Sequence, residues 1–264
     1  MAFLKTIKAL IIDIDGVLWH GKQPLPGVPE FFDFLRAHQI SFIIATNNSA
    51  RPASDVTNRL KRMGVSIDDS KILTSAEATA LSLPRIAPNA KRVYVVGGEG
   101  LMTALERADY QIVDEDADAV IAGLDPTLTY EKLKIATREI RRGAKFIGSN
   151  SDKTFPLEDG VAPGAGAILA AIQTATDVAP IVIGKPERAM FDIAIEKMSA
   201  ARESTAILGD RLDTDIEGGK RAGLKSILVM TGVTTREILA SSSIKPDWIF
   251  DNLDALRENL ARTY

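Results

Sequence analysis

The sequence predicts an α/β protein built on parallel strands, with one domain inserted into another. Short apolar runs that suit buried strands alternate with helical patterns along all 264 residues, as in consecutive βαβ units. Carboxylates or small polar groups follow several of these runs, whereas the middle third lacks a comparable set of carboxylates. A chain of this length forms one large domain or two ordinary ones. These observations favour a discontinuous domain of parallel strands that is interrupted by an insertion.

Apolar runs predict the strands, and apolar residues at helical spacing predict the helices, in the following order along the chain. Strands are predicted at 8–13, 41–46, 92–96, 118–122, 145–149, 180–184, 205–209, 226–230 and 247–250. Helices are predicted at 28–38, 53–63, 75–82, 99–108, 129–142, 164–175, 187–200, 213–222, 234–240 and 252–262. Thr74 and Glu77 form a capping box at the start of the third helix, and Gly64 ends the second.

Proline marks two predicted domain junctions. Leu83–Pro88 contains two prolines and lies in the first junction, at 75–90, and Pro180 lies in the second, at 176–181. We therefore expect residues 1–77 and 180–264 to form one domain, with residues 78–179 as a lid or cap.

The composition excludes several kinds of site. With 45% hydrophobic and 25% charged residues the chain is an ordinary globular protein, and its net charge of -3 gives no electrostatic footprint for nucleic acid. Without Cys, and with only His20 and His38, it has no thiolate site or histidine-rich metal centre. A bound metal should be a hard ion with oxygen ligands, Mg²⁺ before Zn²⁺. The N-terminal residues resemble neither a signal peptide nor a membrane span, so we expect a cytoplasmic protein without a membrane partner.

The first motif is an acidic pair after the first predicted strand. Asp13 and Asp15 follow the apolar run Ala9–Ile12, and Gly16 gives the turn conformational freedom. In an open α/β sheet, ligands bind outside the carboxyl ends of the strands. One carboxylate of such a pair can attack an electrophile while the other handles protons, and the pair can hold a hard cation. An ordinary Asp-Gly turn is the alternative interpretation.

Two further strand ends carry groups that suit a phosphate. Thr46, Asn47 and Asn48 end the second predicted strand, where a hydroxyl, side-chain amides and backbone N–H groups can bind phosphate oxygens. Lys185 follows another apolar run, and Pro186 favours an extended lysine whose ammonium can face an anion. An Asn-rich turn and a solvated surface lysine are the respective alternatives.

A second acidic group follows the strand predicted at 205–209. Gly209-Asp210 repeats the pattern of a strand followed by aspartate, which makes Asp210 the best candidate metal ligand. Asp213 and Asp215 lie at the start of the next predicted helix, where capping or support of the site is at least as good an interpretation as direct ligation. Together, the four strand ends provide all the groups of a site for phosphate and Mg²⁺.

With these four motifs in this order, the chain resembles a phosphatase of the haloacid dehalogenase (HAD) superfamily, subfamily IIA. This group includes para-nitrophenyl phosphatase, phosphoglycolate phosphatase and pyridoxal phosphate phosphatase. The resemblance covers the whole length and implies a Rossmann-like, parallel-sheet HAD core with an inserted α/β cap domain of type C2A. Glycine-rich turns at 95–100, 122–125 and 163–166 fall where related turns lie in the cap. Ser149-Asn150-Ser151-Asp152 departs mildly from the Thr-Asn-x-Asp of relatives.

The resemblance also implies a role for each motif residue. Asp13 corresponds to the nucleophile and Asp15 to the general acid/base, while Asp215 corresponds to an acidic position that braces the site. The implied Mg²⁺ ligands are Asp13, the backbone carbonyl of Asp15, and Asp210. The implied phosphate-binding residues are Thr46, Asn47, Asn48 and Lys185.

The function that follows is Mg²⁺-dependent hydrolysis of a small phosphate monoester through an aspartyl-phosphate on Asp13. One alternative is a phosphotransferase or phosphomutase. A dehalogenase is another, although it would not need a carboxylate at Asp15. A catalytically silent ligand-binding regulator would be expected to lack Asp13 or Lys185. Gly98–Thr103 lacks the third small residue of a dinucleotide fingerprint, so no nucleotide cofactor is expected there.

We expect a small phosphorylated metabolite as the partner, and no nucleic acid. Relatives often dimerise through the cap, so the resemblance implies a homodimer formed there, while no residue pattern decides the oligomeric state. No aromatic or charged pattern in the cap selects among phosphoglycolate, nucleotides, sugar phosphates and pyridoxal phosphate.

Overall fold

A computed structural model describes residues 4–157 and 160–262, and their contacts divide the chain into two compact units. The first unit contains the residues up to Ala45, Val56–Leu73 and the residues from Pro186 onward. The second unit contains Thr46–Asp55 and Thr74–Lys185. The predicted assignment of residues 78–179 as a cap remains a prediction. Positions 1–3, 158–159 and 263–264 of the predicted domains lie outside the described residues.

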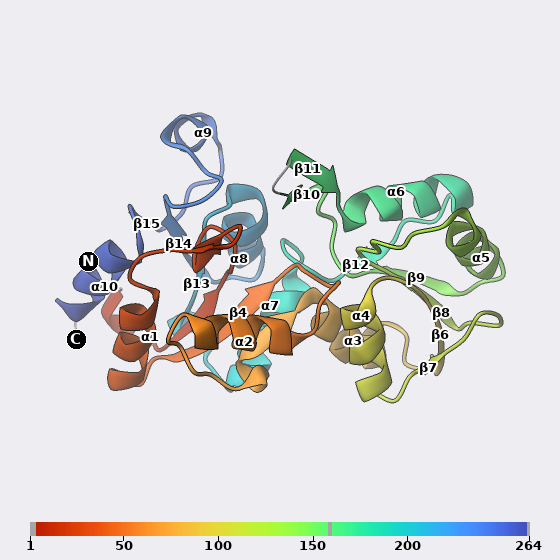
Figure 1. Cartoon of the computed structure of the whole chain (residues 1–264), viewed down its shortest axis with the longest axis horizontal. Coiled ribbons are helices and arrows are strands. Elements are labelled where there is room, and N and C mark those ends of the chain that lie inside the picture. Colours follow the sequence, from red (N-terminus) through yellow and green to blue (C-terminus); the bar gives the residue numbers. More distant parts are fainter. Residues whose placement is uncertain (1–3, 158–159, 263–264) are drawn as a thin grey trace. The chain divides into compact units, whose positions relative to one another are not determined.

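The first unit is built on a sheet whose strand order is β15-β14-β13-β1-β4-β5. Figure 1 labels β4, β13, β14 and β15 of this sheet. Its strands are β1 (Ala9–Ile12), β4 (Ser41–Thr46), β5 (Ile72–Thr74), β13 (Thr205–Gly209), β14 (Lys225–Val229) and β15 (Trp248–Phe250). Parallel pairing places Ile11 of β1 opposite Ile43 of β4 and Ile207 of β13. All residues of β1 are buried, as expected for a central parallel strand covered on both faces.

Helices and short turns complete the first unit. The helices are α1 (Val28–Ala37), α2 (Ala53–Arg62, which starts before the boundary at Val56), α7 (Arg188–Met198), α8 (Glu217–Arg221), α9 (Arg236–Ser241) and α10 (Leu253–Ala261). A short antiparallel hairpin, β2 (Trp19–His20) with β3 (Gln23–Pro24), follows β1. Turns of 3₁₀ helix lie at Leu4–Thr6, Asp69–Lys71 and Arg202–Ser204.

The second unit has its own parallel sheet, in the order β12-β9-β8-β6-β7. Its strands are β6 (Arg92–Val96), β7 (Gln111–Ile112), β8 (Ala119–Ala122), β9 (Lys145–Gly148) and β12 (Ile181–Val182). Its helices are α3 (Ser75–Ile86), α4 (Glu99–Arg107), α5 (Tyr130–Arg141) and α6 (Ala165–Thr176). An antiparallel hairpin joins β10 (Thr154–Leu157) to β11 (Gly160–Pro163).

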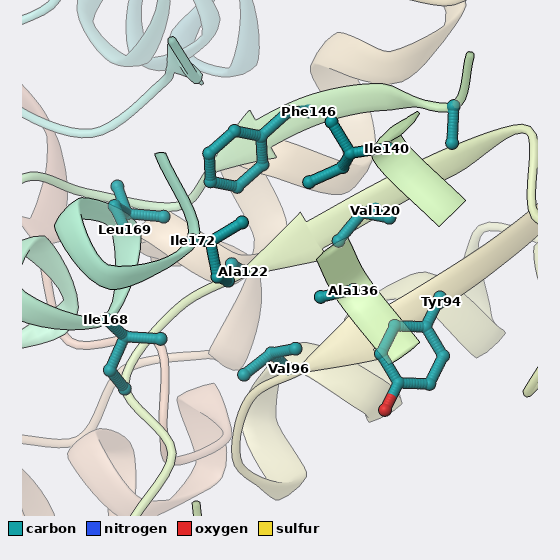
Figure 2. Close-up of a cluster of buried hydrophobic side chains, with 11 residues drawn as sticks. Tyr94, Val96, Val120, Ala122, Ala136, Ile140, Phe146, Ile168, Leu169 and Ile172 are labelled. Carbon is teal, nitrogen blue, oxygen red and sulfur yellow. The ribbon is translucent and has the colours of Figure 1, made fainter. Parts of the chain in front are cut away.

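The core of the second unit lies between its sheet and helices α5 and α6. Figure 2 shows Val96, Val120 and Phe146 from the strands facing Ile140 of α5 and Ile172 of α6. These side chains are almost entirely removed from solvent. Burial of one large aliphatic or aromatic side chain stabilises a fold by about 1.5–3 kcal/mol. The second unit therefore has a hydrophobic core independent of the first sheet.

The predicted α/β class with parallel strands is confirmed. Each predicted strand has a counterpart, and β4, β6 and β13 match their predicted limits. The structure also contains short strands that were not predicted, namely β2, β3, β5, β7, β10 and β11. All six have two to four residues, too few for an apolar pattern to mark them. Within residues 4–157 and 160–262, no helix has both the length and the apolar character needed to span a bilayer.

Most predicted helix limits differ from the observed ones by no more than two residues, and two predicted helices differ further. The helix predicted at 75–82 continues to Ile86, because Pro84 lies in its last turn and Ala87 N still donates to Leu83 O at 2.8 Å. Residues 83–86 thus end a helix instead of forming a linker. The helix predicted at 213–222 starts as a π-helical turn, Leu212–Ile216, and only then becomes α8. There Ile216 N donates to Arg211 O, five residues earlier.

Candidate active site

The parallel sheet of the first unit brings two aspartates to neighbouring strand ends. Asp13 directly follows β1, and Asp210 directly follows β13, the strand paired with it. The backbone N of Asp13 donates to Leu208 O at 2.8 Å, so the ladder between the strands extends to this residue. Because both strands run in the same direction, their carboxyl ends present Asp13 and Asp210 at one edge of the sheet.

A third carboxylate joins these two. Ligand oxygens of Asp13, Asp210 and Asp215 all lie within 4.8 Å of one another. The three residues are only 8%, 1% and 0% exposed. Buried carboxylates this close repel one another unless a cation or protons neutralise them. An all-oxygen, strongly anionic set of donors fits a hard divalent cation such as Mg²⁺. The geometry therefore identifies a candidate metal centre.

Tightly packed glycines shape the surroundings of Asp210. Gly16 has a φ of +81°, and a Cβ there would lie 2.5 Å from Asp210 Oδ2. A Cβ on Gly232 would lie 1.9 Å from the same oxygen. The backbone N of Val233 donates to that oxygen at 2.5 Å, and the Thr231 hydroxyl donates to Gly16 O at 2.6 Å. Only glycine at positions 16 and 232 lets the backbone approach this carboxylate so closely.

The two remaining aspartates after β13 have different surroundings. Asp215 is buried, and its Oδ2 accepts a hydrogen bond from Arg211 N at 3.1 Å, which orients its carboxylate. Asp213 binds the Arg211 guanidinium through both oxygens, at 3.1 and 2.9 Å. Burial raises the pKa of Asp213, but the hydrogen bonds and charge of Arg211 outweigh burial and lower this pKa overall. Asp215 belongs to the acidic cluster, whereas Asp213 forms an ion pair outside it.

Asp15 lies on the tight turn after Asp13 and is exposed. Its Oδ1 accepts a hydrogen bond of 3.0 Å from the indole Nε1 of Trp19. The Arg59 guanidinium stacks on that indole, with its central carbon 3.9 Å from the ring centroid. Burial lowers the pKa of Arg59, and the negative charge of Asp15 acts in the opposite direction. Neither Trp19 nor Arg59 was predicted from the sequence to contact Asp15 or its neighbours.

The predicted phosphate-binding residues all belong to the second unit. Thr46 ends β4 and is buried, and its hydroxyl oxygen accepts a hydrogen bond from Asn48 N at 3.1 Å. Asn48 Oδ1 accepts one from Ala50 N at 2.9 Å. Lys185 is only 2% exposed, so the interpretation of a solvated surface lysine is wrong. A lysine is almost never buried to this extent unless its charge is paired.

Asn47 joins Lys185 to the loop after β9. Its side-chain Nδ2 donates to Lys185 O at 2.9 Å, and its Oδ1 accepts from Lys185 N at 2.8 Å. The same Nδ2 donates to Asp152 Oδ1 at 3.1 Å. Asn150 Nδ2 and Ser75 Oγ both donate to Asn47 O, at 2.7 and 2.6 Å. The Asn47 side chain thus holds the backbone of Lys185, and both polar atoms of its amide are hydrogen-bonded within the protein.

Asn150, Asp152 and Ser75 contact the candidate phosphate-binding residue Asn47, and none of them was assigned to the site from the sequence. The signal for Asn150 and Asp152 was present, because both follow the strand β9. That pattern is the one that marked Asp13 and Asp210. No local pattern marks Ser75, which lies in the first turn of α3 and contacts Asn47 only through the fold.

The chain is similar to known proteins over nearly its whole length. A family model described as haloacid dehalogenase-like hydrolase matches residues 10–111, and a model described as HAD-hydrolase-like matches residues 182–256. A Staphylococcus haemolyticus protein named acid sugar phosphatase is 39% identical over 260 residues, which are 98% of this chain and 98% of that protein.

Solved structures show the same likeness. The crystal structure of 4-nitrophenylphosphatase from Thermotoga maritima matches with a TM-score of 0.93 and 38% identity, over 98% of this chain and 99% of that one. A p-nitrophenyl phosphatase from Archaeoglobus fulgidus matches with a TM-score of 0.90 and 34% identity, over 96% and 99% of the two chains.

Proposed function

Because this chain belongs to subfamily IIA of the haloacid dehalogenase-like hydrolases and is a phosphatase of that family, we propose that it hydrolyses small phosphate monoesters through an aspartyl-phosphate on Asp13, with Mg²⁺ as its cofactor. The observation that carries this proposal is the buried cluster of Asp13, Asp210 and Asp215. A cluster of this kind destabilises the fold on its own, and a catalytic cation explains why it is there.

The reaction has two steps. In the first, the Asp13 carboxylate attacks phosphorus in line, the bond from phosphorus to the ester oxygen breaks, and Asp15 gives a proton to the departing oxygen. In the second, Asp15 takes a proton from a water molecule, whose oxygen attacks the phosphorus of the aspartyl-phosphate. Inorganic phosphate leaves, and the Asp13 carboxylate is restored.

The metal centre would be formed by Asp13, the backbone carbonyl of Asp15 and Asp210, with Asp215 beside them. Mg²⁺ bound there would supply positive charge that offsets the repulsion between the phosphate oxygens and the attacking carboxylate. We assign phosphate binding to Thr46, Asn47, Asn48 and Lys185. For Asn47 this role falls to its backbone N–H, because its side chain is bonded to Lys185 and Asp152.

We assign the region 78–179 as the cap and a small phosphorylated metabolite as the substrate. The name of the Staphylococcus haemolyticus relative favours sugar phosphates as the first compounds to test. A location in the cytoplasm and a homodimer formed through the cap are further parts of this proposal. A catalytically silent regulator is disfavoured, because Asp13 and Lys185 are both present and buried.

The test is a phosphatase assay of the purified chain with 4-nitrophenyl phosphate and a panel of sugar phosphates, phosphoglycolate, nucleotides and pyridoxal phosphate. We expect activity that requires Mg²⁺, is lost with a chelator, and is abolished in Asp13→Asn without unfolding. Asp33→Asn, which changes an exposed aspartate of α1, serves as the control and should retain activity. Full turnover in metal-free buffer, or a tenth of the normal rate in Asp13→Asn, would contradict the proposal.

A further inference from the structure

The turn that carries Asp15 is fixed along its backbone. Gly16 N donates to Trp19 O at 2.7 Å, and Leu18 N donates to Ile14 O at 2.8 Å. The Asp15 side chain projects from this turn and is exposed. An exposed carboxylate on a rigid backbone can still rotate about its own side-chain bonds. A general acid must hold its proton within hydrogen-bond reach of the departing oxygen. A contact that orients the Asp15 side chain would therefore support this role.

Trp19 provides such an orienting contact. It is only 5% exposed, and its Nε1 donates to Asp15 Oδ1 across 3.0 Å. An indole N–H can donate a hydrogen bond but cannot accept one. The oxygen that it contacts acts as the acceptor and leaves Oδ2 free of this hydrogen bond to give or take a proton. The contact thereby orients the carboxyl group and favours Oδ2 as the reactive oxygen.

Arg59 contacts the face of the Trp19 indole and holds it in place. Its guanidinium stacks on the Trp19 ring at 3.9 Å, a geometry that supports a cation–π interaction. One of its terminal nitrogens donates to Gly21 O at 2.5 Å, in the turn between β2 and β3. The guanidinium therefore connects α2, which carries it, with the hairpin that begins at Trp19.

We propose that Trp19 is a positioning residue for proton transfer, which directs the reactive oxygen of Asp15 through its indole N–H, and that Arg59 acts by fixing the indole. This inference rests on the proposed role of Asp15 as general acid. It predicts that loss of the N–H impairs reactions in which the departing oxygen needs a proton, and largely spares those in which it does not.

The experiment compares kcat/KM for two substrates, because this quantity reports the steps up to the first chemical cleavage. 4-Nitrophenyl phosphate has a leaving group that departs readily without a proton, whereas glycerol 3-phosphate releases an alkoxide that needs one. In Trp19→Phe we expect the value for glycerol 3-phosphate to fall about tenfold more than the value for 4-nitrophenyl phosphate, equivalent to about 1.4 kcal/mol. Arg59→Gln should change the two values in the same direction by a smaller factor.

A second variant separates the hydrogen bond from packing. Replacement of Trp19 by β-(3-benzothienyl)alanine keeps the size and shape of the indole while sulfur replaces the N–H. It should reproduce the selective loss even if Trp19→Phe fails to fold. Trp248→Phe, which changes the other tryptophan of the chain, and Arg62→Gln, on the same helix as Arg59, are the matched controls and should leave the ratio of the two values unchanged.

Asp15→Asn distinguishes the failure of this inference from that of the proposed function. If Asp15→Asn loses glycerol 3-phosphate activity selectively and the benzothienyl variant does not, the role of Trp19 is wrong and that of Asp15 stands. Equal losses for both substrates in the benzothienyl variant, or no loss, would overturn the positioning role. If Asp15→Asn affects both substrates equally, the general-acid assignment itself is wrong and this inference falls with it.

Discussion

Gly16→Ala is the substitution whose effect follows most directly from the geometry of the acidic cluster. Gly16 has a φ of +81°, where a residue with a Cβ is disfavoured by about 1–2 kcal/mol. Gly64 has a φ of +85° and no atom within 4 Å of a Cβ placed on it. The variants Gly16→Ala and Gly64→Ala therefore share the backbone strain, and they differ in what the new methyl group contacts.

The methyl group at position 16 would overlap the candidate metal centre. Its carbon would lie 2.5 Å from Asp210 Oδ2, whereas ordinary contacts begin at 3.4 Å. Asp210 is 1% exposed and is bonded through this oxygen to Val233 N, so it has little room to move. A shift of about 1 Å is needed to relieve the overlap, and a misplacement of that size can reduce catalysis about 10²-fold.

The assay combines urea unfolding with kcat/KM for 4-nitrophenyl phosphate over a range of Mg²⁺ concentrations. Gly64→Ala should lose about 1–2 kcal/mol of unfolding free energy and keep its activity. Gly16→Ala should lose more stability, fall about 10²-fold in activity and need more Mg²⁺ for its residual rate. If the two variants have the same activity, the close approach of Gly16 to Asp210 does not shape the active site.

Three further substitutions test other parts of the structure. Asn47→Ala removes three side-chain hydrogen bonds, to Lys185 and Asp152, and should lower the free energy of unfolding in urea by about 2–3 kcal/mol. Asn48→Ala removes one and should lower it by about 1 kcal/mol. Equal losses in the two variants would contradict the role of Asn47 in holding Lys185. Asp210→Asn should raise the melting temperature in the absence of metal, because it relieves repulsion between the carboxylates. Mg²⁺ should raise the melting temperature of this variant less than that of the unmodified chain. Calorimetry of both proteins at the same Mg²⁺ concentrations measures the two effects. Burial raises the pKa of Asp247, but hydrogen bonds from Lys225 and Ser226 outweigh it and lower this pKa overall. The stabilisation is therefore present above the ordinary carboxyl pKa and is lost as the pH falls through the lowered one. Asp247→Asn should accordingly cost about 1 kcal/mol near pH 7, a value reduced by solvent screening, and progressively less in acid; a difference independent of pH would contradict the assignment.

The parallel sheets and the acidic residues could be predicted because their signals are local. β1 is a run of apolar residues that ends at Asp13, and β13 is a run that ends next to Asp210. Such runs mark buried parallel strands, and parallel strands place their carboxyl ends at one edge of a sheet. The gathering of Asp13 and Asp210 therefore follows from two short segments of sequence.

The contacts that orient the site could not be predicted in the same way. Trp19 and Arg59 are forty residues apart, and nothing in either segment indicates that a guanidinium stacks on the indole. The roles of Asp213 and Asp215 also depended on a detail that periodicity does not encode, because the π-helical turn Leu212–Ile216 changes which side chains share a face. The side chain of Asn47 looked like a phosphate ligand and instead holds Lys185, because its partner lies 138 residues away.

In the proposed mechanism Asp13 carries the phosphoryl group during turnover, and direct trapping of the phosphorylated enzyme tests this. In Asp15→Asn the second step should slow, because no carboxylate removes the proton from the attacking water, and general base catalysis contributes about 10²–10⁴-fold. We predict that acid quenching of this variant with Mg²⁺ and 4-nitrophenyl phosphate yields a phosphorylated peptide modified at Asp13, and that Asp13→Asn yields none. Release of nitrophenol in a burst without any phosphorylated Asp13, or phosphorylation at another residue, would contradict the account.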